Sequence, residues 1–209
     1  MPKLRTEERI TLSIGQYQQA VDKRLERFEQ DLFAKKLWAK DTGIWPGDEK
    51  VRKSISGCLG WLDAPKQSIP LIKELESFAN EVVKDGFTNV VLLGMGGSSL
   101  APEVFQKTMG NQKQYPTLIV LDSTDPEAIG AVESKVDLNS TLFIVASKSG
   151  TTIETHSLFL YFYEQMKNRK GDRAGKHFVA ITDAGTSLVQ TAQNLGFRRI
   201  FLAPADVGG

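Results

Sequence analysis

Residues 89–100 read NVVLLGMGGSSL, and this stretch decides the fold because it joins an apolar run to a glycine-rich loop and a helix start. The apolar run occupies 89–93, and comparable runs recur at 117–121, 141–146, 178–182 and 200–202. Helix-like stretches separate these runs at 98–109, 126–133, 151–168 and 187–195. Alternating strands and helices predict a doubly wound α/β fold, in which helices cover both faces of a parallel sheet. The runs are apolar throughout, as expected for strands buried on both sides.

The sequence before this region predicts helices alone. Between residues 14 and 40, apolar side chains recur close to the helical period, which indicates one amphipathic helix. The stretch 41–47, DTGIWPG, breaks that pattern, and shorter helices are expected at 48–61 and 68–85. Gly86 suits the C-terminal cap of the last of them. We therefore predict a helical lead-in over residues 1–86 and an α/β domain over residues 87–209.

Composition and charge restrict the class of protein. The chain has 209 residues, 41% of them hydrophobic, which is enough for a buried core. Its formal net charge of +1 favours neither nucleic acid nor an anionic membrane as the main partner. Cys58 is the only cysteine, so no internal disulfide can form, and no set of metal-ligating residues stands out. A polar N-terminal segment and the lack of a membrane-length apolar run lead us to expect a cytoplasmic protein.

Glycines and hydroxyl side chains follow the apolar runs, where each predicted strand ends. In an open parallel sheet, ligands bind beyond the carboxyl ends of the strands. The first three runs are followed by GMGGSSL at 94–100, DSTDP at 122–126 and SKSGTT at 147–152. Glycines let the backbone approach a ligand closely, and the start of a helix favours an anion. The loop at 94–100 therefore indicates an anion site or, on the simpler interpretation, a tight turn between a strand and a helix.

The loop at 147–152 is more informative, because it surrounds Lys148 and Gly150 with serine and threonine side chains. Hydroxyls, backbone amides and an ammonium group are what a phosphate monoester needs. Serine and threonine are also common as helix N-caps, but a cap needs only one or two of them. Two such loops at one end of a sheet favour a phosphate site over a structural cap.

Dinucleotide binding is a rival interpretation, since a glycine loop, a helix and a strand ending in Asp122 resemble a nicotinamide-binding unit. The third glycine of that fingerprint is Ser99 here, and the loop at 147–152 has no role in dinucleotide binding. A sugar phosphate is the better ligand, with a nicotinamide-dependent dehydrogenase as an alternative.

Two segments together closely resemble the glucose-6-phosphate isomerase family: GMGGSSL at 94–100 and SKSGTTIET at 147–155. The second is similar to the family signature Ser-Lys-Thr-x-Thr-Thr-x-Glu-Thr, with Ser149 in place of a threonine. LGWLD at 59–63 looks most like bacterial members fused behind a transaldolase. The family has two sugar-isomerase (SIS) domains, each a Rossmann-like three-layer unit with a parallel sheet. The resemblance implies that this chain covers the lead-in and the first SIS domain.

The resemblance also implies roles for individual residues. The substrate phosphate would be held by Ser147, Lys148, Ser149 and Thr152. The glycine loop would contact the sugar or the phosphate through Gly97 and Ser98. Glu154 matches a glutamate that supports the ring-opening histidine of the family, and a solvated acid in a first helical turn is the alternative. The remaining candidates, His156 and His177, match no catalytic position of the family and are expected to be structural or exposed.

The implied reaction is the interconversion of glucose 6-phosphate and fructose 6-phosphate, an aldose–ketose isomerisation of glycolysis and gluconeogenesis without metal or organic cofactor. In the family, a glycine pair like Gly208 and Gly209 precedes an arginine. The base glutamate, the ring-opening histidine and a late lysine of the family come further on, and would lie beyond residue 209. The resemblance allows a homodimer. We expect this chain to anchor the phosphate and to lack the base, and a stand-alone sugar-phosphate sensor without catalysis is the alternative.

Overall fold

The computed structural model describes residues 14–208 and shows two compact units, Met1–Ser56 and Gly57–Gly209. The described part of the first unit consists of short helices: α1 (Gln18–Gln30), α2 (Phe33–Trp38) and α3 (Glu49–Ser56). None of its described residues is buried. The helices of this unit therefore enclose no core among themselves.

The expected single helix over residues 14–40 is divided between α1 and α2. Leu32, which joins them, has a positive φ of 52°, a left-handed conformation that ends a helix. The chain bends there, and the rings of Phe28 and Phe33 stack with their centroids 4.5 Å apart. The apolar period runs through this bend unbroken, so periodicity alone predicted one helix. The next expected helix, 48–61, ends earlier than predicted, at Ser56.

The second unit begins with α4 (Ala64–Ser68) and α5 (Ile72–Lys84), and strands and helices then alternate. The strands are β1 (Asn89–Gly94), β2 (Thr117–Leu121), β3 (Thr141–Ala146), β4 (Phe178–Thr182) and β5 (Arg199–Leu202). The helices between them are α6 (Gly97–Met109), α7 (Pro126–Glu133), α8 (Ile153–Lys170) and α9 (Ser187–Asn194). The expected division into domains at residue 86 stays a prediction.

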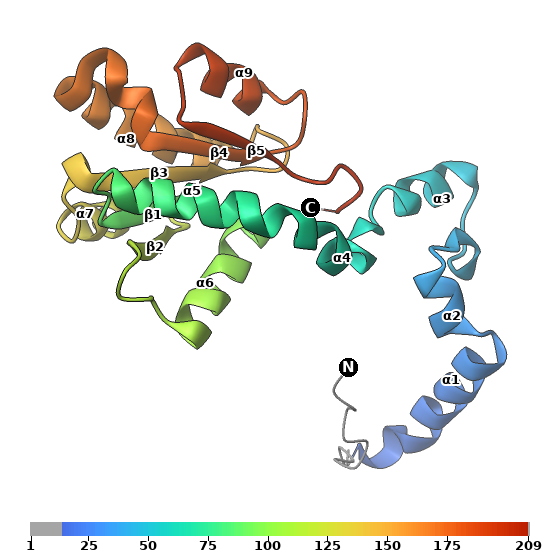
Figure 1. Ribbon diagram of the computed structural model, residues 1–209. Coiled ribbons are helices and arrows are strands. Elements are labelled where there is room, and N and C mark those ends of the chain that lie inside the picture. The colour runs from blue at the N-terminus through green and yellow to red at the C-terminus, as the bar shows by residue number, and fades with distance from the viewer. Residues whose placement is uncertain (1–13, 209) are drawn as a thin grey trace. The chain divides into compact units, whose positions relative to one another are not determined.

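All five strands pair in parallel in the order β2-β1-β3-β4-β5 (Figure 1). The predicted doubly wound α/β fold is thus confirmed. The strand order reverses between β1 and β3, because β2 lies on the other side of β1 from β3. In sheets of this kind, ligands bind at such a switch point, beyond the carboxyl ends of the strands.

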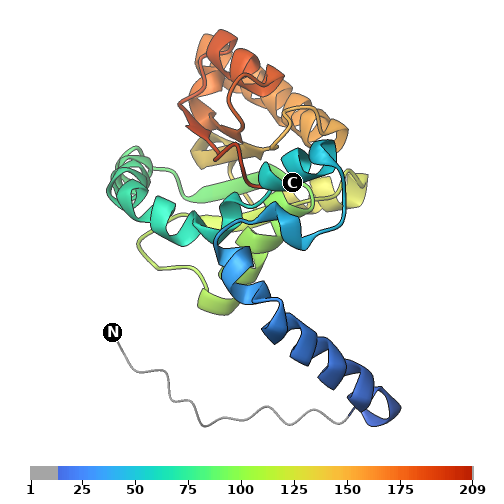
Figure 2. The same cartoon turned by 90° about the vertical axis from the view of Figure 1, so that its right-hand side faces the viewer.

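Two separate cores hold helices to the two faces of the sheet. On one face, Phe162 of α8 stacks on Phe143 of β3, with the ring centroids 4.7 Å apart. On the opposite face, Val82 of α5 packs against Leu142 and Val179. Figures 1 and 2 agree in placing α5 and α8 on opposite sides of the sheet. Phe143 and Val145 of β3 belong to the first core and Leu142 and Ile144 to the second, which is why this strand is apolar on both faces.

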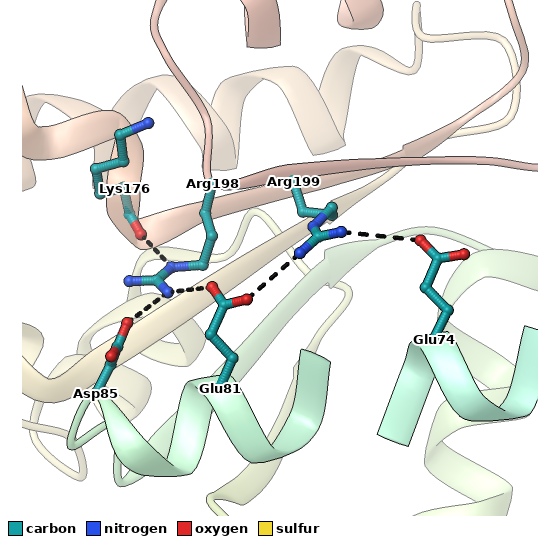
Figure 3. Close-up of polar contacts among 6 residues, drawn as sticks. All are labelled: Glu74, Glu81, Asp85, Lys176, Arg198 and Arg199. Atoms are coloured by element: carbon teal, nitrogen blue, oxygen red, sulfur yellow. Dashed lines mark hydrogen bonds and ion pairs between the residues drawn. The ribbon is translucent and has the colours of Figure 1, made fainter. Parts of the chain in front are cut away.

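Ion pairs add a second connection between α5 and the sheet (Figure 3). The guanidinium of Arg198 donates to Glu81 at 2.8 Å and to Asp85 at 2.7 Å. Arg199, the first residue of β5, reaches Glu81 at 3.3 Å and Glu74 at 3.8 Å. The helix that leads into the sheet is therefore fixed against its last strand.

Within residues 14–208, no helix is both long and apolar enough to cross a membrane.

Candidate functional site

A pocket of about 730 Å³ lies at the carboxyl ends of the strands. Both loops that the sequence singled out line it. The glycine loop contributes Met95, Gly97 and Ser98, and the loop after β3 contributes Lys148, Ser149 and Thr152. The pocket is therefore at the switch point between β1 and β3, where a doubly wound sheet binds its ligands.

Two further segments complete the pocket. The end of β4 contributes Ile181, Thr182 and Asp183, and the segment after β5 contributes Ala203, Pro204, Val207 and Gly208. The second segment presents no side-chain hydrogen-bond donor to the pocket. The side-chain hydrogen-bond donors of the pocket therefore come from the loops after β1 and β3 and from Thr182.

The glycine loop brings the start of α6 to the pocket. Gly96 has a φ of +56°, a conformation that suits glycine, and it forms the N-cap of the helix. Gly94 lies so close to β3 that a β-carbon there would be 3.3 Å from the carbonyl oxygen of Ala146. A β-carbon on Gly97 would meet nothing within 4 Å. The backbone at Gly97 thus faces open space, and the positive end of the helix dipole favours an anion there.

The loop after β3 is folded tightly on itself. The hydroxyl oxygens of Ser147 and Thr152 lie 2.9 Å apart, as do those of Ser149 and Thr151. Gly150 has a φ of +68°, and a β-carbon there would be 2.8 Å from the β-carbon of Thr186. Glycine is required at this position both by the backbone conformation and by the space available. The hydroxyl groups are therefore held in fixed positions at the start of α8.

Lys148 is held at two points by the residue that follows β4. Its ammonium group forms an ion pair with Asp183, and its carbonyl oxygen accepts a hydrogen bond from the Asp183 amide at 3.2 Å. The other carboxylate oxygen of Asp183, Oδ1, is buried and has no hydrogen-bond partner within the described residues. An ammonium has three donors, so this pair leaves capacity for an anionic ligand. The site thus presents an oriented cation rather than a free one.

The structure does not bring every predicted residue to the pocket. Gly97, Ser98, Lys148, Ser149 and Thr152 line it together. Two other predicted residues, Ser147 and Glu154, are not among the lining residues. Their roles as phosphate ligand and as support for a histidine stay predictions, as do the roles of the lining residues.

The two residues outside the lining differ in their surroundings. Ser147 is buried, and its hydroxyl group contacts Thr152, so it can act on a ligand by holding that threonine in place. Glu154 is exposed in the first turn of α8. An acid at this point is favoured by the helix dipole whatever its further role.

Asp183 and its neighbours Ile181 and Thr182 are site residues that the sequence reasoning missed. Ile181 and Thr182 end the fourth apolar run and Asp183 follows it, and the rule that ligands bind beyond the carboxyl ends of strands applied there as well. The loop after β2 shows the opposite case. Its Asp125 accepts hydrogen bonds from the amides of Glu127 and Ala128, and so caps α7. The residues 122–126 contribute nothing to the pocket lining.

The histidines lie apart from this pocket. His156 is exposed on α8. His177 precedes β4 and therefore lies at the opposite end of the sheet, with Nδ1 2.9 Å from the carbonyl oxygen of Thr141. Burial lowers the pKa of His177 below its usual value. Within residues 14–208, no group of three or more His, Cys, Asp or Glu side chains is arranged to hold a metal ion.

Together, the sheet and the pocket define a doubly wound α/β domain whose switch-point pocket is lined by hydroxyls, an ammonium group and the start of a helix. Residues 72–208 match the phosphoglucose isomerase family, over most of the chain's length. The chain therefore belongs to the phosphoglucose isomerase family. The matched residues include both loops of the pocket and the segment after β5.

Curated relatives agree with this assignment. Glucose-6-phosphate isomerase of Campylobacter jejuni is 36% identical over 155 residues, which cover 74% of this chain and 37% of that protein. Glucose-6-phosphate isomerase of a Cyanothece species is 32% identical over 168 residues, covering 71% of this chain and 32% of that protein. The chain thus spans about a third of the length of the curated relatives it matches.

Solved structures share the fold. A hypothetical protein from Thermus thermophilus superposes with a TM-score of 0.66 and 26% identity, covering 90% of this chain and 42% of that one. Glucose-6-phosphate isomerase from Chlamydia trachomatis gives a TM-score of 0.55 at 22% identity, covering 82% of this chain and 31% of that one. At that identity the second likeness supports the fold alone.

Proposed function

We propose that this chain binds glucose 6-phosphate and fructose 6-phosphate, as the phosphate-anchoring part of an isomerase that interconverts them. The observation that carries the proposal is the pocket in which Ser149, Thr152 and Lys148 meet the start of α6. Hydroxyls, an oriented ammonium and two helix N-termini together suit a phosphate dianion. The names of the curated relatives supply the rest of the ligand, a six-carbon sugar.

In the proposed reaction, a base moves a proton between C2 and C1 of the open-chain sugar through a cis-enediol. The base must lie within hydrogen-bond reach of that proton. Asp183 is the only carboxylate among the lining residues of the described pocket, and it is paired with Lys148. The part this chain would play is to anchor the phosphate, so that remote binding energy orients the reacting carbons.

We further propose that the base comes from a second SIS domain of the whole protein, and that Glu154 supports its ring-opening histidine. A cytoplasmic location and a homodimer are part of the same proposal. Analytical ultracentrifugation tests the dimer. A coupled assay tests the division of labour: the 209-residue chain should show negligible isomerase activity, whereas the chain joined to a second SIS domain of a relative should turn over substrate.

Titration followed by nuclear magnetic resonance tests the binding proposal. Glucose 6-phosphate, fructose 6-phosphate and orthophosphate should shift the amide resonances of Ser149, Thr152 and Ser98, and NAD should not. A response to NAD with none to the phosphosugars would overturn the proposal. Phosphosugar binding without turnover in every longer protein would favour the alternative, a sugar-phosphate sensor.

A further inference from the structure

The short segment before α4 contacts the chain after β5, residues 203–208, which forms one wall of the pocket. Leu59 pairs with Val207 in an antiparallel bridge, and the amide of Gly60 donates to the carbonyl oxygen of Asp206 at 2.7 Å. Val207 and Gly208 line the pocket (Figure 1 shows the C-terminal segment beside the chain that leads into α4). Residues far upstream of the sheet therefore touch the segment that completes the site.

Gly60 is the point of closest approach between the two segments. A β-carbon on Gly60 would lie 2.7 Å from the backbone carbonyl oxygen of Asp206 and would also overlap its carboxylate. Gly60 does not have a positive φ, so space, and not backbone conformation, excludes a larger residue here. The fit is also close on the neighbouring residues, since a β-carbon on Gly208 would be 3.3 Å from the β-carbon of Cys58. A side chain at position 60 would have to displace the backbone of residue 206.

The contacting segment is itself anchored. Leu59, Gly60 and Leu62 are buried. Downstream, α5 is fixed to the sheet by its apolar face and by the ion pairs of Arg198. Because this segment is held in place, it can fix the position of the chain after β5 that packs against it.

The wall and the phosphate loops differ in what they offer a ligand. Ala203, Pro204, Val207 and Gly208 provide apolar surface and backbone. The hydroxyls and the ammonium come from the loops after β1 and β3 and from the end of β4. A phosphate needs the donors, so the wall faces the rest of the ligand. Displacing the wall should therefore affect a phosphosugar and leave a bare phosphate ion unaffected.

We propose that Gly60 is a positioning residue for this site. It lets residues 59–62 hold the wall, residues 203–208, in the place where the sugar part of a phosphosugar binds. The proposal rests on the proposed function, because it assigns the sugar to that wall. It gives a role to the LGWLD segment, which lies outside both phosphate loops. Gly60 acts through Asp206 and Val207 and does not itself touch the ligand.

The test compares Gly60→Ala with Gly130→Ala in the 209-residue chain. Gly130 lies in α7, and a β-carbon there meets nothing within 4 Å, so it is a matched control. Amide resonances are followed during titration with glucose 6-phosphate and, separately, with orthophosphate. Gly60→Ala should weaken glucose 6-phosphate binding about ten-fold, equivalent to about 1.4 kcal/mol, and change orthophosphate binding less than about two-fold. Gly130→Ala should change neither affinity.

A measurement without ligand separates this inference from the proposed function. In Gly60→Ala the amides of Val207 and Gly208 should shift, while those of Ser149 and Thr152 stay in place. If the unmodified chain binds glucose 6-phosphate and Gly60→Ala binds it equally well, the inference fails and the proposed function stands. If the unmodified chain binds no phosphosugar, the proposed function fails and the role in sugar binding fails with it.

A second variant guards against misfolding. Should Gly60→Ala not give a folded spectrum, Leu59→Ala removes buried side-chain volume beside the bridge without adding a clash. It should loosen the wall and weaken glucose 6-phosphate binding in the same direction, by a smaller factor. Equal weakening of glucose 6-phosphate and orthophosphate in either variant would show a general loss of structure and would overturn the proposal.

Discussion

Basic side chains form ion pairs with carboxylates at both ends of the sheet, and the two sets of pairs differ in whether they face a pocket. At the carboxyl end, the ion pair of Lys148 and Asp183 lines a pocket, and one carboxylate oxygen has no partner within the described residues. At the amino end, Arg198 donates to Glu81, Asp85 and the carbonyl oxygen of Lys176 (Figure 3). The first arrangement has capacity for a ligand. In the second, every acceptor belongs to the fold itself, and the role of the cluster is to hold α5.

Removing the cluster around Arg198 should have the larger effect, and it should act on stability. Arg198→Ala should lower the free energy of unfolding by about 2 kcal/mol, because Arg198 is only 14% exposed and loses charged hydrogen bonds that are partly screened by solvent. Urea denaturation measures this change as a shift in midpoint.

Arg199→Ala is the matched control for that loss. Its pairs are longer, 3.3 and 3.8 Å, and its side chain is 39% exposed, so the expected destabilisation is smaller. An equal loss of unfolding free energy in both variants would contradict the prediction, because the shorter hydrogen bonds and the greater burial of Arg198 would then add nothing.

Breaking the ion pair between Lys148 and Asp183 should act on binding instead. Lys148→Ala removes the ammonium and leaves the Asp183 carboxylate facing the phosphate, so phosphosugar affinity should fall about ten-fold. Adding Asp183→Asn should restore part of that affinity, since the repelling charge is gone. Isothermal titration of the single and double variants measures both steps, and an unchanged affinity in Lys148→Ala would make the pair structural like that of Arg198.

A titratable group at the amino end gives a smaller effect. Burial lowers the pKa of His177 in the folded state, so the unfolded chain binds more protons as the pH falls through the usual histidine range. The free energy of unfolding should therefore decrease on going from about pH 7.5 to about pH 5.5. Urea midpoints at the two pH values measure this, and His177→Gln should reduce the difference between them.

The smallest effect should come from Glu154. Because its side chain is exposed and does not line the pocket, Glu154→Gln should leave the affinity for glucose 6-phosphate in this chain within about two-fold, less than about 0.5 kcal/mol. The titration used for Lys148 measures it. A larger loss would place Glu154 among the groups that bind the phosphate.

The sequence predicted the sheet and the edge of the sheet at which the pocket lies, because both depend on local patterns. Continuous apolar runs indicate buried parallel strands, and the residues that follow them meet at one edge. The direction in which a single side chain points does not follow from such a pattern, because it depends on the surrounding packing. Ser147 and Ser149 are equivalent in the sequence, but Ser147 turns inward to Thr152 while Ser149 lines the pocket. Asp183 could have been predicted by applying the same rule to the fourth run.

Other features left no signal in the sequence. The bend at Leu32 interrupts a helix whose apolar period continues across it, so a pattern of periodicity does not register it. The contact of Gly60 with Asp206 joins segments that are remote in the chain. Nothing in the residues around either position specifies the other, because the distance between them is set by the whole intervening sheet.

The bridge between Leu59 and Val207 also has a consequence for the order of folding. It closes a loop that contains all five strands, and loop-closure entropy makes such a contact unfavourable until the intervening elements have formed. During synthesis, residues 204–208 leave the ribosome after every strand of the sheet. The pocket should therefore reach its final shape only after the sheet has formed, so a nascent chain has its five strands before it has a finished binding surface.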